Sequence, residues 1–331
     1  MNVNAFLWDT AKKGLALPIL GFPAATKLGI KIGDLVRSAE LTSKVISYVS
    51  QNTDIAAAMS LMDLSLEAEA FGAQIAFSEG EVPAVTKPVI YSPDDADKIR
   101  VASLSDGRIP MAIEAVRISA ERIKDKPVIA GMIGPYSLAG RLLDVTEIIY
   151  YCYDEPDAVK TVLDKTSDFL IDYARALRDA GAVGVLIAEP LAGILNPKMA
   201  EEFSFPYVKK IVDAVKNDDF AVIYHNCGNS VGMMLDGIFS QGASAYHFGN
   251  ASDMKAILEN APSDIICMGN IDPVSCFTDG NKENMESSVS SLLEACGKYP
   301  NFILSSGCDI PPHAKWENIE AFFCTAKKCR S

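Results

Sequence analysis

The chain has 331 residues, of which 49% are hydrophobic and 22% charged, a composition typical of a globular protein with a large buried core. Its formal net charge of −13, with basic residues grouped in no more than pairs, argues against a nucleic-acid-binding protein. No apolar run reaches the length of about 18 residues that a membrane-spanning helix needs, and no signal peptide is recognisable, so we expect a cytoplasmic protein.

Short apolar runs rich in β-formers alternate along the chain with longer helical patterns, which indicates βα units around a parallel sheet. The predicted strands are residues 16–21, 57–63, 128–134, 184–189, 221–227, 244–249, 265–270 and 302–307. Apolar spacings of three and four predict helices that include 156–180, 200–216, 230–241, 251–260, 283–299 and 315–328. Eight strands predict an α/β fold of the (β/α)8 TIM-barrel type, with an N-terminal extension. Because no Pro- or Ser-rich linker divides the sequence, residues 1–331 are expected to form a single domain.

The ends of several predicted strands turn polar or small. The strand endings read "IAEP" at Glu189, "YHNCGN" at 224–229, "MGNIDP" at 268–273 and "SSGCDIPP" at 305–312. In (β/α)8 barrels the functional residues gather at the carboxyl ends of the strands, so this bias predicts an active site there.

A candidate metal site lies in this set. His225 and Cys227 are two apart on a predicted strand and therefore point to the same side, and Cys308 directly follows the last strand. One imidazole and two thiolates suit zinc, and three protein ligands leave the fourth position open for a substrate. A closed structural site would need a fourth ligand, for which His313 is the candidate nearest in the sequence. An accidental pattern is the alternative, because Cys is often buried without any function.

The remaining cysteines lie singly, or five apart near the C-terminus, and are interpreted as reduced thiols without a functional role. No glycine-rich phosphate-binding motif is present, so the sequence gives no support to nucleotide binding.

The segments "YHNCGN", "MGNIDP" and "SSGCDIPPHAKWENIEAF" (305–322) resemble the zinc-dependent methylcobalamin:coenzyme M methyltransferases, a branch of the uroporphyrinogen decarboxylase superfamily. Further similar stretches are "MDLSLEAEAFG" (62–72), "GMIGPYSLAGRLL" (131–143) and "IAEPLAGILNPKMAEEFSFPYVKKI" (187–211), so the resemblance extends over nearly the whole chain. It implies a (β/α)8 barrel, which agrees with the strand count.

The resemblance also implies that His225, Cys227 and Cys308 bind Zn2+ and that the zinc binds the thiol of a methyl acceptor such as coenzyme M. A free thiol has a pKa of about 8.5, and metal coordination deprotonates it to the attacking thiolate. The methyl donor is then methylcobalamin carried by a separate corrinoid protein. Each His lacks the D-x-H-x-x-G setting that resembles those of cobalamin carriers, so this chain is not expected to hold its own cobalt.

Two carboxylates are further candidates for the catalytic site. Glu189 ends a strand and could be a weak fourth zinc ligand, a group supporting the ligands, or a surface-loop acid. Asp63 matches the position of the catalytic aspartate of the decarboxylases, although an acid also occurs there in the methyltransferase branch. With Glu67 it could line the pocket or position the acceptor, whereas in a helical segment the spacing of four would place both on one solvated helix face.

Three alternatives remain open beside the thiol methyltransferase. One is a lyase of the uroporphyrinogen decarboxylase type, which is disfavoured because the stretch "LGFPAATKLGI" (20–30) has no Arg, whereas the decarboxylases use several in this region to hold a carboxylate-rich substrate. Another is a corrinoid methyltransferase with a non-thiol acceptor such as tetrahydrofolate. The third is a non-catalytic, zinc-stabilised scaffold.

Overall fold

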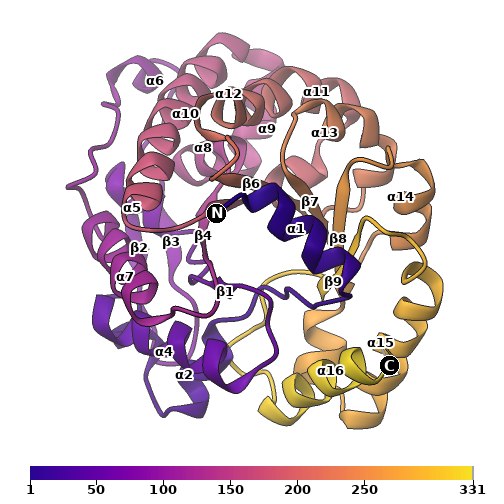
Figure 1. Ribbon diagram of the computed structural model, residues 1–331. Helices are drawn as coiled ribbons and strands as arrows, with labels where there is room; N and C mark the ends of the chain where they lie inside the picture. The colour runs from indigo at the N-terminus through magenta and orange to yellow at the C-terminus, as the bar shows by residue number, and fades with distance from the viewer. Residues whose placement is uncertain (330–331) are drawn as a thin grey trace.

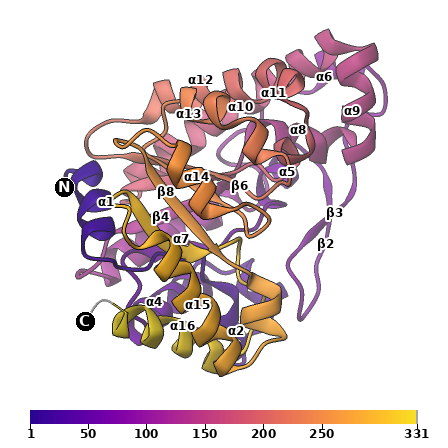
Figure 2. The ribbon, with the colours of Figure 1, turned by 90° about the vertical axis from the view of Figure 1, so that its right-hand side faces the viewer.

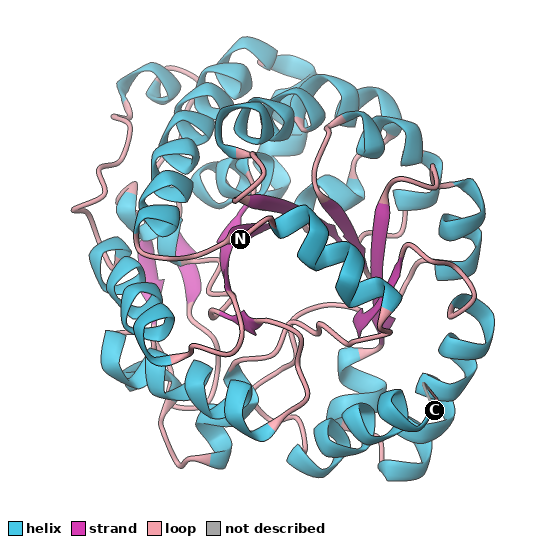
Figure 3. Cartoon of the chain, in the orientation of Figure 1, coloured by secondary structure: helices cyan, strands magenta, loops and turns pink. Residues whose placement is uncertain are grey.

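The computed structural model describes residues 1–329. Within them, seven parallel strands form one sheet in the order β1-β4-β5-β6-β7-β8-β9, and β2 and β3 form a separate antiparallel hairpin. The strands are β1 (Ala58–Met59), β2 (Gln74–Ala76), β3 (Ala84–Lys87), β4 (Val128–Ile133), β5 (Gly184–Ala188), β6 (Ala221–Asn226), β7 (Ala245–Phe248), β8 (Ile266–Ile271) and β9 (Phe302–Ser306). The sheet curls, and helices surround it on the outside (Figure 3).

The helices that precede β5 are α1 (Val3–Lys12), α2 (Phe22–Lys27), α3 (Ile32–Leu35), α4 (Ala39–Asn52), α5 (Leu66–Ala70), α6 (Asp95–Lys98), α7 (Ile109–Arg122), α8 (Pro135–Leu143), α9 (Val145–Asp154) and α10 (Pro156–Asp179). Those that follow are η1 (Leu191–Ile194), α11 (Pro197–Phe203), α12 (Phe205–Val215), η2 (Val231–Met233), α13 (Leu235–Ser240), α14 (Met254–Asn260), η3 (Pro273–Thr278), α15 (Lys282–Cys296) and α16 (Trp316–Lys328). No helix in residues 1–329 combines the length and apolarity needed to span a membrane.

The central strands are apolar because both of their faces are covered. All residues of β5 ("GVLIA") and β6 ("AVIYHN") are buried, as expected for a parallel sheet with helices outside and packed side chains inside. The amphipathic helix α10 contributes residues such as Phe169 and Leu170 to the same core. Seven of the eight predicted strands are confirmed, although the strand expected at 57–63 is reduced to β1.

The first predicted strand, residues 16–21, is wrong as a strand. The segment lies between β9 and β1, where the Leu17 N–H donates to the Leu304 carbonyl and the Ala56 N–H donates to the Ala16 carbonyl, both at 2.9 Å. Pro18 has no N–H, so it cannot contribute to a continuous ladder. The sheet is therefore a seven-stranded, curled parallel sheet, and the predicted eight-stranded sheet is corrected to that extent.

Two helical expectations also change. The helix predicted at 200–216 is two helices, α11 and α12, which meet at Ser204. The stretch 230–241 contains the short η2 followed by α13. The hairpin β2–β3 was not predicted, because its strands are short and largely exposed and carry little apolar periodicity.

The two ends of the curled sheet differ. At the amino ends of the strands, α1 lies across the ring, and its Val3 N–H donates to the carbonyl of Asp218, just before β6 (Figure 1). The hairpin β2–β3 projects from the opposite side (Figure 2). The carboxyl ends of the strands, which carry the polar residues identified in the sequence, therefore lie at the hairpin end.

Candidate metal centre

His225, Cys227 and Cys308 come together at the carboxyl ends of β6 and β9. One ligand atom from each, a ring nitrogen and two Sγ atoms, lies within 4.8 Å of the others, and in residues 1–329 this is the one group of three or more His, Cys, Asp or Glu side chains placed to hold a metal ion. His225 is buried, and both thiols are half-buried. The structure thus brings together the three residues that were predicted as zinc ligands.

The local backbone explains why the two residues of β6 converge. His225 is in β6 and Cys227 directly follows it, so the two-residue alternation of a strand places both side chains on the inner side. Gly249, after β7, lies against Cys227: a Cβ at that glycine would come within 2.5 Å of the Cys227 Cα and Cβ. A larger residue at position 249 would displace the thiol.

Hydrogen bonds define the tautomer of His225 through a second histidine. The Ser305 hydroxyl donates to the Leu17 carbonyl at 2.7 Å, so its single proton is used. The 2.8 Å contact between Ser305 Oγ and His247 Nε2 therefore requires Nε2–H of His247 as the donor. His247 Nδ1 is then an acceptor, and it lies 2.8 Å from Nδ1 of His225.

The consequence is that His225 carries its proton on Nδ1 and presents the Nε2 lone pair to the thiols. Nε2 lies 3.6 Å from the Cys308 Sγ, while Nδ1 also lies 3.2 Å from the His247 carbonyl oxygen. Burial, followed by the neighbouring His225, lowers the pKa of His247 well below its ordinary value, which agrees with a neutral ring. A neutral imidazole with a free Nε2 is the form that binds metals.

His247 was not identified from the sequence. It follows from strand register, because His225 and His247 are directly paired neighbours on β6 and β7. Both positions lay in predicted strands, so aligning the two strands could have revealed the pair.

The two thiols share protons unequally. A hydrogen bond from Cys308 lowers the pKa of the Cys227 thiol, despite its burial. The same hydrogen bond, followed by burial, raises the pKa of the Cys308 thiol. The metal-free pair therefore favours a state with one thiolate and one thiol, and a cation is needed to stabilise two thiolates at this separation.

The three ligands form part of the wall of a cavity of about 290 Å³ at the hairpin end. The apolar part of its lining comes largely from Ile19, Met62, Leu64, Val82 and Pro83, so the hairpin and the 16–21 segment both contribute. Its polar lining is supplied by the three ligands together with Arg141 and Asp309. This volume lies near the lower limit of pockets that hold small molecules, about 300 Å³.

Glu189 lies outside the metal group, and the surface-loop alternative for it is wrong because it is fully buried. Its carboxylate accepts hydrogen bonds from the N–H groups of Tyr136 and Ser137 at 2.8 and 3.0 Å, and from the Ser137 hydroxyl at 2.8 Å. Burial raises its pKa to about 7, although these hydrogen bonds oppose the shift. Glu189 thus binds the amino end of α8 to the end of β5.

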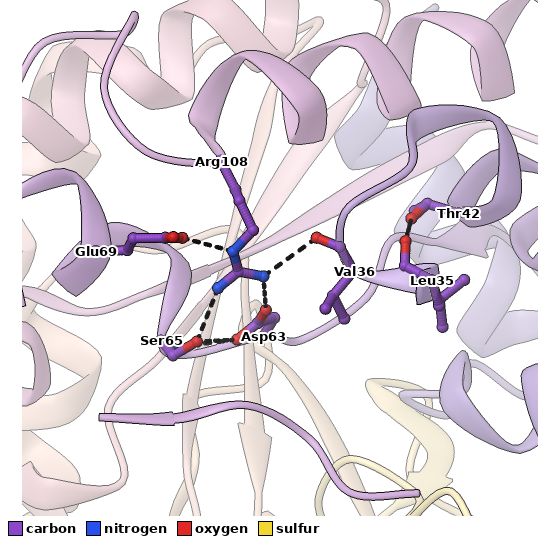
Figure 4. Close-up of polar contacts among 7 residues, drawn as sticks. All are labelled: Leu35, Val36, Thr42, Asp63, Ser65, Glu69 and Arg108. Atoms are coloured by element: carbon purple, nitrogen blue, oxygen red, sulfur yellow. Dashed lines mark hydrogen bonds and ion pairs between the residues drawn. The ribbon is translucent and has the colours of Figure 1, made fainter. Parts of the chain in front are cut away.

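Asp63 is also placed differently from the expectation. Its carboxylate is paired with the guanidinium of Arg108 and accepts a 2.6 Å hydrogen bond from the Ser65 hydroxyl (Figure 4). Arg108 further contacts Glu69 and donates to the Val36 carbonyl at 3.2 Å. Asp63 lines a neighbouring cavity, whereas the residues on either side of it line the one that contains the metal ligands. The structure therefore does not bring Asp63 to the metal group.

His313, considered from the sequence as a fourth ligand, lies elsewhere. It is exposed, and its Nε2 is 3.0 Å from a carboxylate oxygen of Glu81 in the β2–β3 connection. The group of His225, Cys227 and Cys308 accordingly offers three candidate ligands in the described part of the chain, and none of the candidates for a fourth joins it.

Comparison with known proteins places the chain in a family. The chain belongs to the uroporphyrinogen decarboxylase (URO-D) family, whose sequence profile matches residues 19–329. It is 34% identical to the methylcobamide:CoM methyltransferase MtbA of Methanosarcina mazei over 273 residues, which cover 81% of this chain and 78% of that protein. It is 29% identical to the uroporphyrinogen decarboxylase of Vibrio campbellii over 304 residues, or 87% of this chain and 84% of that one.

A solved structure supports the fold. A methyltransferase from Methanosarcina mazei superposes with a TM-score of 0.87, covering 100% of this chain and 99% of the other at 22% sequence identity. At this sequence identity the similarity shows a shared fold alone.

Proposed function

We propose that the protein transfers a methyl group from a methylated corrinoid to a thiol acceptor such as coenzyme M. The observation that carries the proposal is the convergence of one imidazole nitrogen and two thiol sulfurs, within 4.8 Å, on the wall of a small cavity at the carboxyl ends of the strands. The similarity to methylcobamide:CoM methyltransferases of two Methanosarcina species, at 34% and 31% identity, supports this chemistry.

The donor set fits zinc. Two thiolates and a neutral imidazole are soft to borderline ligands that suit Zn2+, and three of them leave one tetrahedral position open. His225, Cys227 and Cys308 would hold the ion. When bound, zinc supplies a Lewis acid that coordinates the acceptor thiol and deprotonates it, which makes the sulfur a nucleophile at neutral pH.

The proposed reaction is a single methyl transfer. A sulfur–carbon bond forms as the cobalt–carbon bond breaks, the cobalt leaves as Co(I) with both electrons of that bond, and the proton of the thiol is released. The cavity of about 290 Å³ accommodates a short acceptor but not a corrin ring. The donor is therefore expected to dock at the cavity entrance while carried by a separate corrinoid protein.

Turnover in solution tests the proposal. Purified zinc-loaded protein is mixed with methylcobalamin and, in separate reactions, coenzyme M, other thiols and tetrahydrofolate, while the cobalt spectrum is followed. We expect demethylation with a thiol and loss of that activity after the metal is removed by a chelator. Transfer to tetrahydrofolate alone would favour the alternative acceptor, and a zinc-containing protein without any transfer would favour the scaffold.

Replacing His247 by Phe should weaken zinc binding, because His225 then loses the ring nitrogen that accepts its Nδ1 proton at 2.8 Å and the hydrogen bonds that continue to Ser305, and keeps only the longer 3.2 Å contact with the backbone carbonyl of residue 247. Removal of partners that orient a metal ligand typically costs about 10- to 100-fold in metal affinity. Competition with a chromophoric chelator measures this loss.

Tyr246→Phe is the matched control for His247→Phe. Tyr246 is next to His247 in β7, but its hydroxyl bonds to the Phe239 carbonyl, away from the ligands. Ser305→Ala removes only the last hydroxyl of the hydrogen-bonded series His225–His247–Ser305. It should also weaken zinc binding. Unchanged zinc affinity in both His247→Phe and Ser305→Ala would show that the hydrogen bonds through His247 and Ser305 do not orient His225.

A decarboxylase-type lyase is the second candidate, because relatives with that activity in their names are 29% identical over most of the chain. Two features of the structure argue against it. Asp63 is paired with Arg108, with only 6% of its side chain exposed, and the cavity wall carries a metal-ligand group that a decarboxylase of this type does not need. Decarboxylation of uroporphyrinogen by the metal-free protein would establish the lyase.

A further inference from the structure

The half-buried Arg141 differs from the buried Arg108 in its lack of partners. It lies in the last turn of α8 and lines the same cavity as His225, Cys227 and Cys308. Arg108, by comparison, makes hydrogen bonds or ion pairs with four residues. The Arg141 side chain is half-buried. Its Nε is inaccessible to solvent and has no hydrogen-bond partner.

Within residues 1–329, no carboxylate lies within 4 Å of the Arg141 guanidinium, and the guanidinium makes no hydrogen bond. The acid that acts on it most, Asp63, is already bound to Arg108, and burial lowers the pKa of Arg141 more than Asp63 raises it. Asp309 lines the same cavity but forms no ion pair with Arg141. A partly desolvated cation without a counter-ion is energetically costly, so the chain leaves at this cavity wall a charge that a ligand can neutralise.

The cavity therefore has two recognition elements of different chemistry in a largely apolar chamber. One is the group of soft ligands, which binds sulfur through a metal, and the other is a guanidinium, whose fork of N–H donors matches the oxygens of a carboxylate or sulfonate. A volume of about 290 Å³ limits the occupant to a short molecule that carries both functions.

Resting on the proposed function, we propose that Arg141 binds the anionic end, a sulfonate or a carboxylate, of the thiol acceptor. Arg141 is then a specificity-determining residue: it selects charged thiols over neutral thiols and orients the sulfur toward the metal ligands.

Steady-state kinetics with methylcobalamin as donor and thiols of similar length test the assignment. The thiols are 2-mercaptoethanesulfonate, 3-mercaptopropionate and the neutral 2-mercaptoethanol. In the wild-type protein kcat/KM is expected to be higher for an anionic thiol than for 2-mercaptoethanol. Arg141→Met should lower this ratio by about 10- to 100-fold, mainly through KM of the anionic thiol, since a hydrogen-bonded charge contributes that much to binding.

Two further variants separate charge from structure. Arg141→Lys keeps the positive charge but loses the fork, and it should restore part of the ratio. Arg117→Met removes one positive charge from an exposed, ion-paired position on α7 and should leave the ratio unchanged. The relative rates of the sulfonate and the carboxylate then identify the preferred oxyanion.

Ligand binding without turnover gives an independent readout. Saturation-transfer NMR should detect ethanesulfonate, an anion that lacks the thiol, bound to metal-free wild-type protein and not to Arg141→Met. Equal losses for charged and neutral thiols in Arg141→Met, or ethanesulfonate binding that survives the substitution, would overturn the assignment. If wild-type protein methylated no thiol at all, the proposed function would fail, whereas ethanesulfonate binding that depends on Arg141 would still support the anion site.

Discussion

Replacing Cys308 by Ala is expected to abolish zinc binding and methyl transfer together. The variant retains only His225 and Cys227, and the sulfur that joins the site from β9 is lost. Since loss of residues that merely orient a ligand costs about 10- to 100-fold in affinity, loss of the ligand should exceed about 100-fold. Metal content after gel filtration and the rate of methylcobalamin demethylation measure the two effects.

Cys324→Ala is the control for this substitution. Cys324 is an exposed thiol on α16, and its removal should change neither zinc content nor rate. A Cys308→Ala protein that is folded, binds stoichiometric zinc and turns over at the wild-type rate would refute the metal centre.

Replacing Arg108 by Met is expected to cause a large loss of stability. The variant leaves Asp63 buried without its cation and removes the hydrogen bonds to Ser65 and the Val36 carbonyl. Breaking a buried ion pair by removing one partner costs about 3–5 kcal/mol, because the remaining charge is uncompensated. Urea unfolding followed by circular dichroism measures the change in the free energy of unfolding.

The comparison for Arg108, the N-cap residue of α7, is Arg117→Met within that helix. Arg117 pairs with Glu114 and Glu121 at the surface, where ion pairs contribute little to stability. The double variant Arg108→Met/Asp63→Asn, which removes both charges, should recover part of the lost stability. Equal costs for the Arg108 and Arg117 substitutions would show that the network of Figure 4 does not hold this part of the fold together.

Most of the strands were predictable because the strands of a buried parallel sheet are short apolar runs that need no knowledge of their neighbours. Residues 16–21 look the same in sequence, but Pro18 removes a donor and the segment forms isolated hydrogen bonds with its neighbours. The hairpin β2–β3 is mostly exposed, so its apolar pattern is weak. The strand predictions thus failed where strand pairing depends on the available backbone N–H donors or where the strands are exposed to solvent.

The site was predictable where its geometry is local. His225 and Cys227 share one strand, and Cys308 follows another whose exit lies on the same end of the sheet. The environment of the acids could not be predicted, because the partners of Glu189 and Asp63 come from α8 and from the start of α7, about 50 residues away in each case. Arg141 was overlooked for a related reason: what distinguishes it is the lack of a partner, which no sequence pattern reports.

The hydrogen-bond chain that orients His225 ends on the backbone of Leu17, in the segment between β9 and β1. We therefore expect a metal ion bound by His225 to stabilise the position of this segment, and the ordered segment to raise the affinity for the ion by the same free energy. Slower hydrogen–deuterium exchange at the Leu17 amide in zinc-loaded protein would reveal this coupling, and identical exchange with and without the ion would exclude it.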